Sequence, residues 1–175
     1  MTGFGFWYPP QFYPPFDDVA YNPYSFSRYT PYPGDSSSGQ SMQLVLQLIR
    51  EGISGEAQDE MFYDYLIRLA PTEQERQIIT GIRNDERKHR RMFRQLYTAL
   101  TGQQPPVDGQ QERFEPPASY LAGIEQALLG ELRAFEKYRT IYLNISPEYR
   151  DVIFEIMTDE LKHAGYYNWL YAKNK

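Results

Sequence analysis

Thiols and imidazoles are scarce in this chain of 175 residues, which contains no cysteine and only two histidines. The absence of cysteine excludes disulfides, thiolate zinc sites, iron–sulfur clusters and thiol chemistry. Any bound metal must therefore be held by nitrogen and oxygen ligands.

The sequence also lacks long apolar runs and an excess of basic charge. No apolar stretch approaches the roughly 20 residues that cross a bilayer, and the formal net charge is −5. The N-terminus lacks the basic start and aliphatic stretch of a secretory signal. We therefore expect a cytoplasmic protein whose partners include neither nucleic acid nor a membrane.

Aliphatic residues are almost absent from the first 39 residues, which instead contain six Tyr, five Phe, one Trp and seven Pro. From Ser41 onward the sequence is rich in Leu, Ile, Glu, Arg and Gln, the composition of helices. We therefore predict a Tyr/Phe/Pro-rich tail over residues 1–40, extended or disordered, and one folded domain over residues 41–175.

The aromatic tail is a candidate for binding a protein partner, for packing on the domain, or for anchoring the chain in an assembly. Similar tyrosine- and proline-rich ends occur in spore-coat proteins. A spore-associated location is therefore the alternative to a simple cytoplasmic one.

Apolar residues at helical spacing predict an all-α domain with four helices, over residues 41–69, 73–100, 118–143 and 147–173. Tight turns join the first helix to the second and the third to the fourth, which predicts two antiparallel hairpins. The connection between the hairpins, about 16 residues, could extend roughly 50 Å, further than the roughly 42 Å of a 28-residue helix. This favours a ferritin-like four-helix bundle with a crossover connection, although a folded surface loop would fit the length too.

The two predicted hairpins repeat each other in sequence. Gly-Glu at 55–56 recurs at 130–131, and a tyrosine follows each glutamate by seven residues. The segment DERKH at 85–89 recurs as DELKH at 159–163. The offsets of 75 and 74 residues differ by one, which a single residue in a turn explains, so the sequence indicates an internal duplication.

Both histidines lie three residues after a glutamate, as Glu86-x-x-His89 and Glu160-x-x-His163. Residues three apart share a helix face, and both pairs continue an apolar stripe that faces the core. Within each hairpin the remaining glutamate lies about as far from the turn as its Glu-x-x-His partner, roughly 22 Å at 1.5 Å per residue. The sequence therefore predicts six metal ligands at one level of the bundle: Glu56, Glu86, His89, Glu131, Glu160 and His163.

Four carboxylates in a dry core would be costly without compensating charge. Two divalent cations would neutralise them, and imidazole with carboxylate suits iron or manganese better than zinc, which prefers tetrahedral sites. We expect two iron ions, with manganese or a mixed Mn/Fe pair as alternatives. The competing interpretation is a degenerate bundle whose buried Glu and His merely hydrogen-bond.

This pattern resembles the ferritin-like di-iron carboxylate superfamily, which combines a Glu from each of two helices with Glu-x-x-His from the other two. The Gly-Glu pair, the tyrosine seven residues on and the Glu-x-x-His about 30 residues later are most similar to the rubrerythrin group. The resemblance implies that Glu56 and Glu131 are terminal ligands, that Glu86 and Glu160 bridge, and that each histidine binds one metal.

The resemblance also assigns residues around the ligands. It implies that Tyr63 and Tyr138 hydrogen-bond the ligating carboxylates, and that Asp85 and Asp159 accept the outer ring N–H of a histidine across the bundle. The plainer interpretation is that these tyrosines are core aromatics and that these aspartates face solvent. Lys88 and Lys162, which also repeat, are expected to reach solvent.

Two departures from the rubrerythrin pattern affect what can be carried over. The chain has no cysteine-ligated rubredoxin domain, so an external electron donor is expected. The extra glutamate often found three residues after the first ligand of the third helix is replaced by Ala134. Asp59 and Glu60, at comparable places on the first helix, are candidate substitutes.

The resemblance implies a non-haem dimetal redox protein that reacts with hydrogen peroxide or dioxygen. A rubrerythrin-like peroxidase is expected first, then a ferroxidase or a manganese-type catalase, and homodimerisation is common in the group. The alternative from another class is a structural or coat-associated protein in which the metals mainly stabilise the bundle.

Overall fold

The computed structural model describes residues 38–106 and 114–175, without the side chains of Ser38 and Glu56. The predictions for residues 1–37 therefore lie outside the described part of the chain. The described residues form five α-helices, a short 3-10 helix at Pro147–Tyr149 and no strand. The α-helices are α1 (Ser38–Ile53), α2 (Glu56–Leu69), α3 (Glu73–Thr101), α4 (Tyr120–Asn144) and α5 (Arg150–Asn174).

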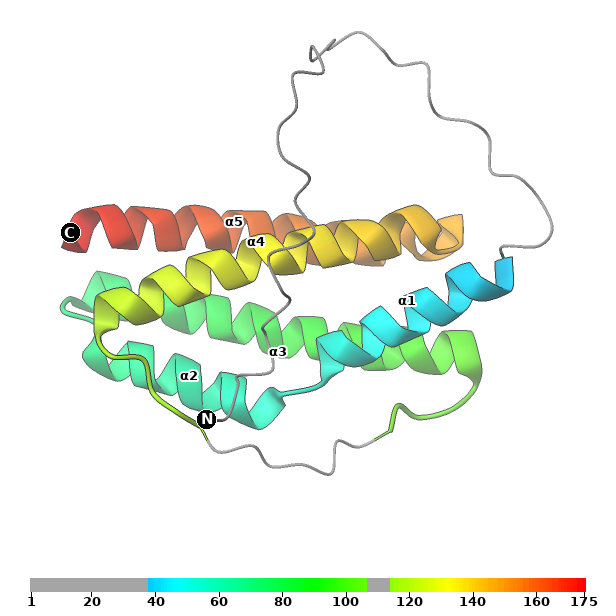
Figure 1. Cartoon of the computed structure of the whole chain (residues 1–175), viewed down its shortest axis with the longest axis horizontal. Helices are drawn as coiled ribbons and strands as arrows, with labels where there is room; N and C mark the ends of the chain where they lie inside the picture. The colour runs from blue at the N-terminus through cyan, green and yellow to red at the C-terminus, as the bar shows by residue number, and fades with distance from the viewer. Residues whose placement is uncertain (1–37, 107–113) are drawn as a thin grey trace, which may run out of the picture. The chain divides into compact units, whose positions relative to one another are not determined.

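The predicted first helix over residues 41–69 is interrupted, which corrects the sequence-based expectation. α1 ends at Ile53, and Gly55, the residue before α2, has a left-handed φ of 77°. Glycine adopts this conformation at little steric cost because it has no Cβ. α1 and α2 both contact α3 and α4, so together they occupy the place of one helix of a bundle (Figure 1).

Two antiparallel hairpins make up the bundle, which confirms the predicted ferritin-like fold. α2 turns into α3 to form the first hairpin together with α1, while α4 and α5 form the second (Figure 1). The end of α3 and the start of α4 lie at opposite ends of the bundle, so α3 and α4 run in the same direction. The chain between them must travel the length of the bundle, as a crossover does.

Local signals explain where the helices begin and end. The Thr72 hydroxyl accepts a hydrogen bond from the backbone N–H of Glu75 (3.3 Å) at the start of α3, and Ser119 does the same for Ala122 (3.1 Å) at the start of α4. These are N-caps of the kind predicted for Thr72. Gly102, with a φ of 70°, ends α3.

Two apolar clusters fill the bundle, one beside α1 and the other beside α2. The cluster beside α1 includes Val45, Ile49, Phe93, Leu96, Tyr138, Ile141, Ile153 and Ile156. The cluster beside α2 includes Tyr63, Leu66, Ile79, Ile82, Ile124, Tyr167 and Leu170. Along α3 and α5 the histidines lie between residues of the two clusters, so the core has a polar middle layer.

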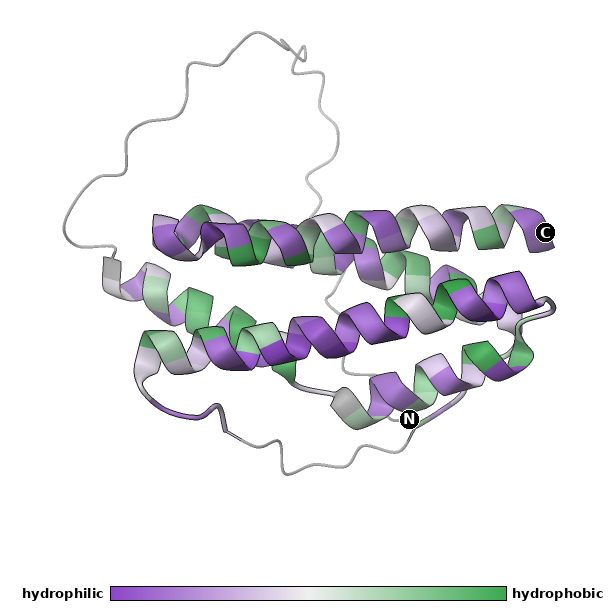
Figure 2. Cartoon of the chain, turned by 180° about the vertical axis from the view of Figure 1, so that it is seen from behind, coloured by the Kyte–Doolittle hydropathy of each residue, from purple (hydrophilic) through white to green (hydrophobic). Residues whose placement is uncertain are grey.

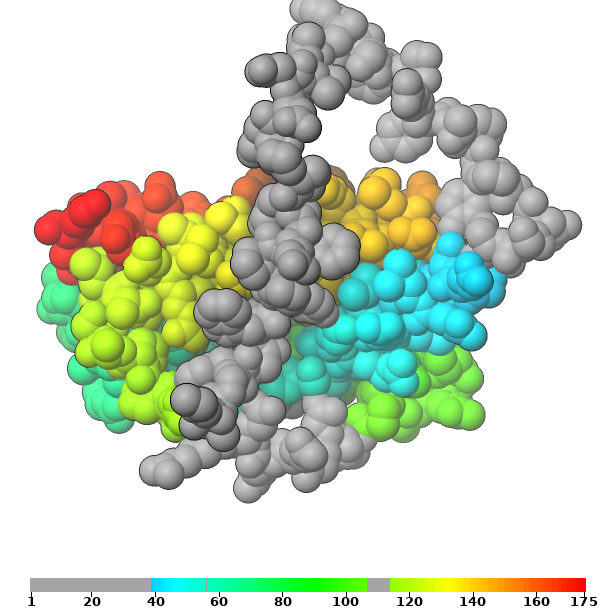
Figure 3. Space-filling model, in the orientation of Figure 1, coloured from blue at the N-terminus to red at the C-terminus, as the bar shows by residue number. Residues whose placement is uncertain are grey.

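Figure 2 shows a hydrophilic stretch along the middle of the outward face of α3. In the space-filling view α1 lies between the C-terminal part of α3 and that of α4 (Figure 3). Within the described ranges, no helix is both long and apolar enough to cross a membrane.

Candidate metal centre

The structure brings five of the six predicted ligands together in the polar middle layer. Glu86 and His89 come from α3, Glu131 from α4, and Glu160 and His163 from α5. Four of these side chains are buried, with exposed fractions of 2% for His89, 6% for Glu131, 1% for Glu160 and 0% for His163. The side chain of the sixth, Glu56 on α2, lies outside the described part of the chain.

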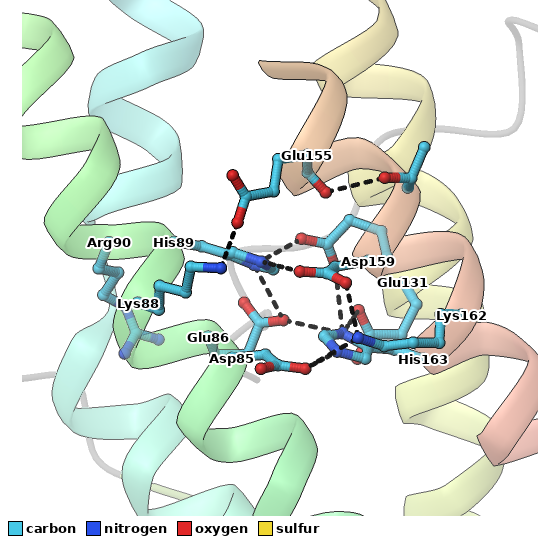
Figure 4. A network of polar contacts seen from close by, with 12 residues as sticks. Asp85, Glu86, Lys88, His89, Arg90, Glu131, Glu155, Asp159, Lys162 and His163 are labelled. Carbon is cyan, nitrogen blue, oxygen red and sulfur yellow. Dashed lines mark hydrogen bonds and ion pairs between the residues drawn. The ribbon is translucent and has the colours of Figure 1, made fainter. Parts of the chain in front are cut away.

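One oxygen or nitrogen atom from each of Glu86, Glu131, Glu160 and His163 lies within 4.8 Å of the others. Both histidines turn Nδ1 toward these carboxylates (Figure 4). His163 Nδ1 lies 3.2 Å from Glu86 Oε1, 3.7 Å from Glu131 Oε2 and 3.9 Å from Glu160 Oε2. His89 Nδ1 lies 3.1 Å from Glu160 Oε1 and 3.6 Å from Glu86 Oε1.

Glu86 and Glu160 therefore each lie near both histidines, as a carboxylate that bridges two metals must. The ring nitrogens and carboxylate oxygens that converge here do not form hydrogen bonds with one another. Glu86 Oε1, both oxygens of Glu160, and Nδ1 of His89 and His163 are buried and have no hydrogen-bond partner in the described part of the chain.

Buried polar atoms in folded proteins nearly always have partners. Lone-pair atoms that converge from several helices without pairing are what a cation would satisfy, and the donor set of imidazole nitrogen and carboxylate oxygen suits iron or manganese. The residues of the site therefore fit a bound metal.

The outer nitrogen of each histidine contacts an aspartate from the other hairpin. His89 Nε2 lies 3.1 Å from Asp159 Oδ2, and His163 Nε2 lies 3.1 Å from Asp85 Oδ2. A carboxylate accepts the Nε2–H, which leaves Nδ1 with its lone pair toward the centre. These are the cross-bundle contacts that the sequence predicted, while the ligand roles themselves stay predictions.

Lys162 joins the two aspartates. Its Nζ lies 3.1 Å from Asp85 Oδ2 and 2.6 Å from Asp159 Oδ1. Although burial acts in the opposite direction, hydrogen bonds from His163 and Lys162 hold the pKa of Asp85 below its ordinary value. Lys88 instead forms an ion pair with Glu155. Both lysines reach the surface, as expected, but each forms ion pairs with carboxylates.

Tyr63 and Tyr138 are both buried close to the centre. Within the described residues, no hydrogen bond joins either hydroxyl to a carboxylate, so their predicted role stays a prediction. Burial, followed by the charges of Glu86 and Glu131, raises the pKa of Tyr63 well above its ordinary value. For Tyr138, burial and then the charges of Glu160 and Glu86 raise the pKa in the same way. Both hydroxyls therefore remain protonated hydrogen-bond donors.

Asp59 and Glu60, the candidate substitutes for the missing glutamate, each form an ion pair with an arginine. Arg87 donates from Nε and Nη2 to the two carboxylate oxygens of Glu60, at 2.7 and 2.5 Å. Asp59 pairs with Arg90, whose side chain is only 5% exposed. Burial, partly offset by Arg90, raises the pKa of Asp59 to about 6. Neither carboxylate is among those that converge on the histidines.

Without metal, the centre holds protons in place of cations. Although burial opposes it, the nearby carboxylates of Glu160 and Glu86 raise the pKa of His89 to about 10. Glu131, Glu160 and Glu86 likewise raise the pKa of His163 to about 12. Burial raises the pKa of Glu131 well above its ordinary value. Protons and metals thus compete for the same lone pairs.

Comparison with protein families decides how this centre is classified. Residues 47–123 match the family model described as Rubrerythrin. This match is consistent with a rubrerythrin-like member of the ferritin-like di-iron superfamily. The match covers most of the first hairpin and the start of α4, while the second hairpin, outside the match, carries the repeated motif. Comparisons with curated proteins and with solved structures gave no match.

Two residues near this centre, Arg90 and Tyr167, were given no role in it from the sequence, although the apolar stripe placed Tyr167 in the core. Arg90 is a buried cation whose partner, Asp59, lies on another helix, and no local pattern reveals such a pairing. Tyr167 is fully buried, and its hydroxyl lacks a hydrogen-bond partner in the described ranges. Comparison of the two repeats could have drawn attention to Tyr167, because the matching residue of the first hairpin is Phe93, which has no hydroxyl.

Proposed function

We propose that this chain binds two iron ions and reacts with hydrogen peroxide or dioxygen, as a rubrerythrin-like peroxidase first and a ferroxidase second. The proposed ligands are Glu56, Glu86, His89, Glu131, Glu160 and His163. The observation that carries the proposal is the set of buried, unpartnered oxygen and nitrogen atoms on Glu86, His89, Glu160 and His163. Manganese, or one ion of each metal, is the alternative content.

Two iron ions that change oxidation state together would supply the two electrons that reduce hydrogen peroxide to water. The protein's part is to hold and insulate them. The apolar clusters on either side of the middle layer limit access of water. Asp85 and Asp159 fix the histidine rings, and Tyr63 and Tyr138 stay protonated as donors close to the carboxylates.

Turnover would need electrons from outside this chain. A rubredoxin-type iron site requires cysteine thiolates, and the sequence has none. An external electron donor is therefore part of the proposal.

The test is to load the purified protein anaerobically with Fe(II), quantify the bound iron, and then add stoichiometric peroxide or air while recording the absorption spectrum. About two irons per chain, with ferric bands that appear faster with peroxide than with air, would support a peroxidase. A faster reaction with air would support a ferroxidase. A Glu86→Ala, His163→Ala double variant, checked for helical circular dichroism, is the control.

Bound iron no higher than in the double variant would contradict the proposal. Two ions that bind but react with neither oxidant would instead favour the structural alternative, or manganese as the native metal. A repeat of the loading with Mn(II) and an assay for peroxide disproportionation separates these two cases.

A further inference from the structure

The two halves of the candidate metal centre differ at the position four residues after each histidine. The first hairpin has Phe93 there and the second has Tyr167, at the 74-residue offset of the repeat. Both side chains are fully buried. A hydroxyl thus replaces a ring hydrogen on one side of a site whose predicted ligands are duplicated.

The phenyl ring and the phenol have different surroundings. Phe93 packs on Tyr138, with ring centroids 4.9 Å apart, in the apolar cluster beside α1. Tyr167 lies in the cluster beside α2 with Tyr63 and Leu66. Its hydroxyl oxygen is buried and has no hydrogen-bond partner among the described residues.

An unpartnered buried hydroxyl destabilises a fold, because the group loses its hydrogen bonds to water and gains none. Phenylalanine at the matching position of the first hairpin shows that the bundle accepts a ring without a hydroxyl. The hydroxyl of Tyr167 therefore requires an explanation other than filling space.

Tyr167 lies four residues after His163 on α5, so the two side chains share one face of the helix and the phenol adjoins the half of the centre that contains His163 and Glu131. After burial, the largest causes that raise the pKa of this phenol are the carboxylates of Glu131 and Glu86, followed by Tyr120 and Glu160. The phenol therefore stays protonated beside the converging carboxylates. The remaining orphaned atoms of the described chain, apart from two arginine Nε atoms, belong to the proposed ligands themselves.

We propose that Tyr167 is a positioning residue that donates a hydrogen bond to an oxygen atom held at the metal position beside Glu131. This inference rests on the proposed function, since the acceptor is in place only when metal is bound. The position on the Phe93 side receives no such hydrogen bond. The two metal positions are consequently inequivalent in affinity and in ligand field.

The competing explanation is that Tyr167 only packs in the core. Titration with Co(II), whose absorption reports its ligand field, distinguishes the two explanations in Tyr167→Phe. Tyr149→Phe, a partly buried tyrosine outside the centre, is the matched control. The melting temperature of each protein is measured with and without metal.

We expect wild-type protein to bind two Co(II) ions per chain. Tyr167→Phe should still bind two, with about tenfold weaker binding of one ion and a shift of its absorption band. The metal-free variant should melt no lower than wild type, because the lost hydroxyl had no partner, while the loaded variant should melt lower than loaded wild type. Tyr149→Phe should leave both affinities and the spectrum unchanged.

Equal affinities and spectra in Tyr167→Phe and wild type, with two ions bound to each, would overturn this inference and leave the proposed function standing. Wild-type protein that binds no Co(II) or Fe(II) would overturn both. A metal-free Tyr167→Phe that melts well below wild type would show that the hydroxyl has a structural partner, and would also overturn the inference.

Discussion

Each histidine of the candidate centre has its two ring nitrogens committed in different directions. Nδ1 faces the carboxylates, and Nε2 contacts an aspartate of the opposite hairpin at 3.1 Å. An aspartate in this place fixes the ring orientation and makes the imidazole a stronger ligand. The aspartates should therefore matter for metal binding although they would not touch the metal.

We expect Asp85→Asn to weaken Fe(II) binding by about 10- to 100-fold, because the amide keeps the shape but loses the charge that supports His163. Anaerobic Fe(II) titration measures the effect. Asp64→Asn is the matched control, since Asp64 pairs with Arg83 and is 64% exposed. Equal affinity in Asp85→Asn and Asp64→Asn would show that the Asp85 contact does not support the ligand.

The protonated histidines of the metal-free centre lead to a prediction about pH. With pKa values raised to about 10 and 12, His89 and His163 both carry a proton at pH 7. Metal binding must displace these protons. We expect release of at least two protons per chain at pH 7, one from each histidine, and metal affinity that rises with pH. Calorimetric titrations in buffers of different ionisation enthalpy count the protons.

Stability of the metal-free chain should show the opposite trend. The histidine pKa values lie above the ordinary 6.5 in the folded state, so the stabilisation they provide is complete below about pH 6.5. It is lost as the pH rises toward 10 and 12. Metal binding that releases no protons, or metal-free stability that rises across this range, would contradict the protonated centre.

The sequence predicted most individual side chains of the centre, because their spacing encodes them. Glu86 and His89 share a helix face by local geometry alone, and the repeat transfers the same conclusion to Glu160 and His163. The spacing did not reveal the partners of Arg90 and Tyr167. Their surroundings depend on which residues of other helices lie opposite, and on the register between the hairpins.

At the scale of helices, the break between α1 and α2 is the main departure from expectation. Apolar residues continue at helical spacing on both sides of it, so periodicity predicted one helix. The break is instead set by Gly55, whose left-handed backbone stops α1 from continuing. Helical periodicity indicates which face of a helix is buried. It does not reveal a single residue at which the backbone changes direction.

We expect Gly55→Ala to destabilise the metal-free protein by about 1–2 kcal/mol, the cost of a left-handed L-residue. No atom lies within 4 Å of a Cβ added there, so the effect is purely backbone strain. Gly81→Ala, within α3 and equally open, should stabilise by about 0.5–1 kcal/mol. Chemical denaturation of both variants measures the difference. The same sign of change in both would contradict the assigned role of Gly55.

At the scale of the whole bundle, one buried carboxylate far from the centre ties three helices together. Glu75 of α3 is 1% exposed. It accepts hydrogen bonds from Tyr120 of α4 at 2.8 Å and from Asn174 of α5 at 3.1 Å. It also pairs with Lys173 at 2.9 Å. This contact joins the ends of both hairpins.

Removing that contact should cost stability without affecting the metal centre. We expect Glu75→Ala to destabilise the protein by about 1–3 kcal/mol, because it leaves partly buried donors without their acceptor. Glu73→Ala, on the exposed side of the same turn, should have little effect. Denaturation curves together with Fe(II) stoichiometry test this. Loss of metal binding in folded Glu75→Ala would show that the end of the bundle and the centre are coupled.

The overall topology was predictable because the duplication fixed two matching hairpins and the length of the connection allowed a crossover. The tail was assigned from composition alone, which predicts no contacts. The side chain of Glu56 lies outside the described part of the chain, so its place in the centre rests on the symmetry of the repeat.

The reciprocal aspartate–histidine contacts have a consequence for the origin of the molecule. Because each histidine is oriented by the other hairpin, neither hairpin contains a complete centre. A half-length ancestor could have assembled this site only as an isologous dimer, and duplication then fused the two copies into one chain. Fusion releases the halves from the requirement to be identical. Phe93 opposite Tyr167 and Asp59 opposite Ala134 are two of the positions at which the two halves differ.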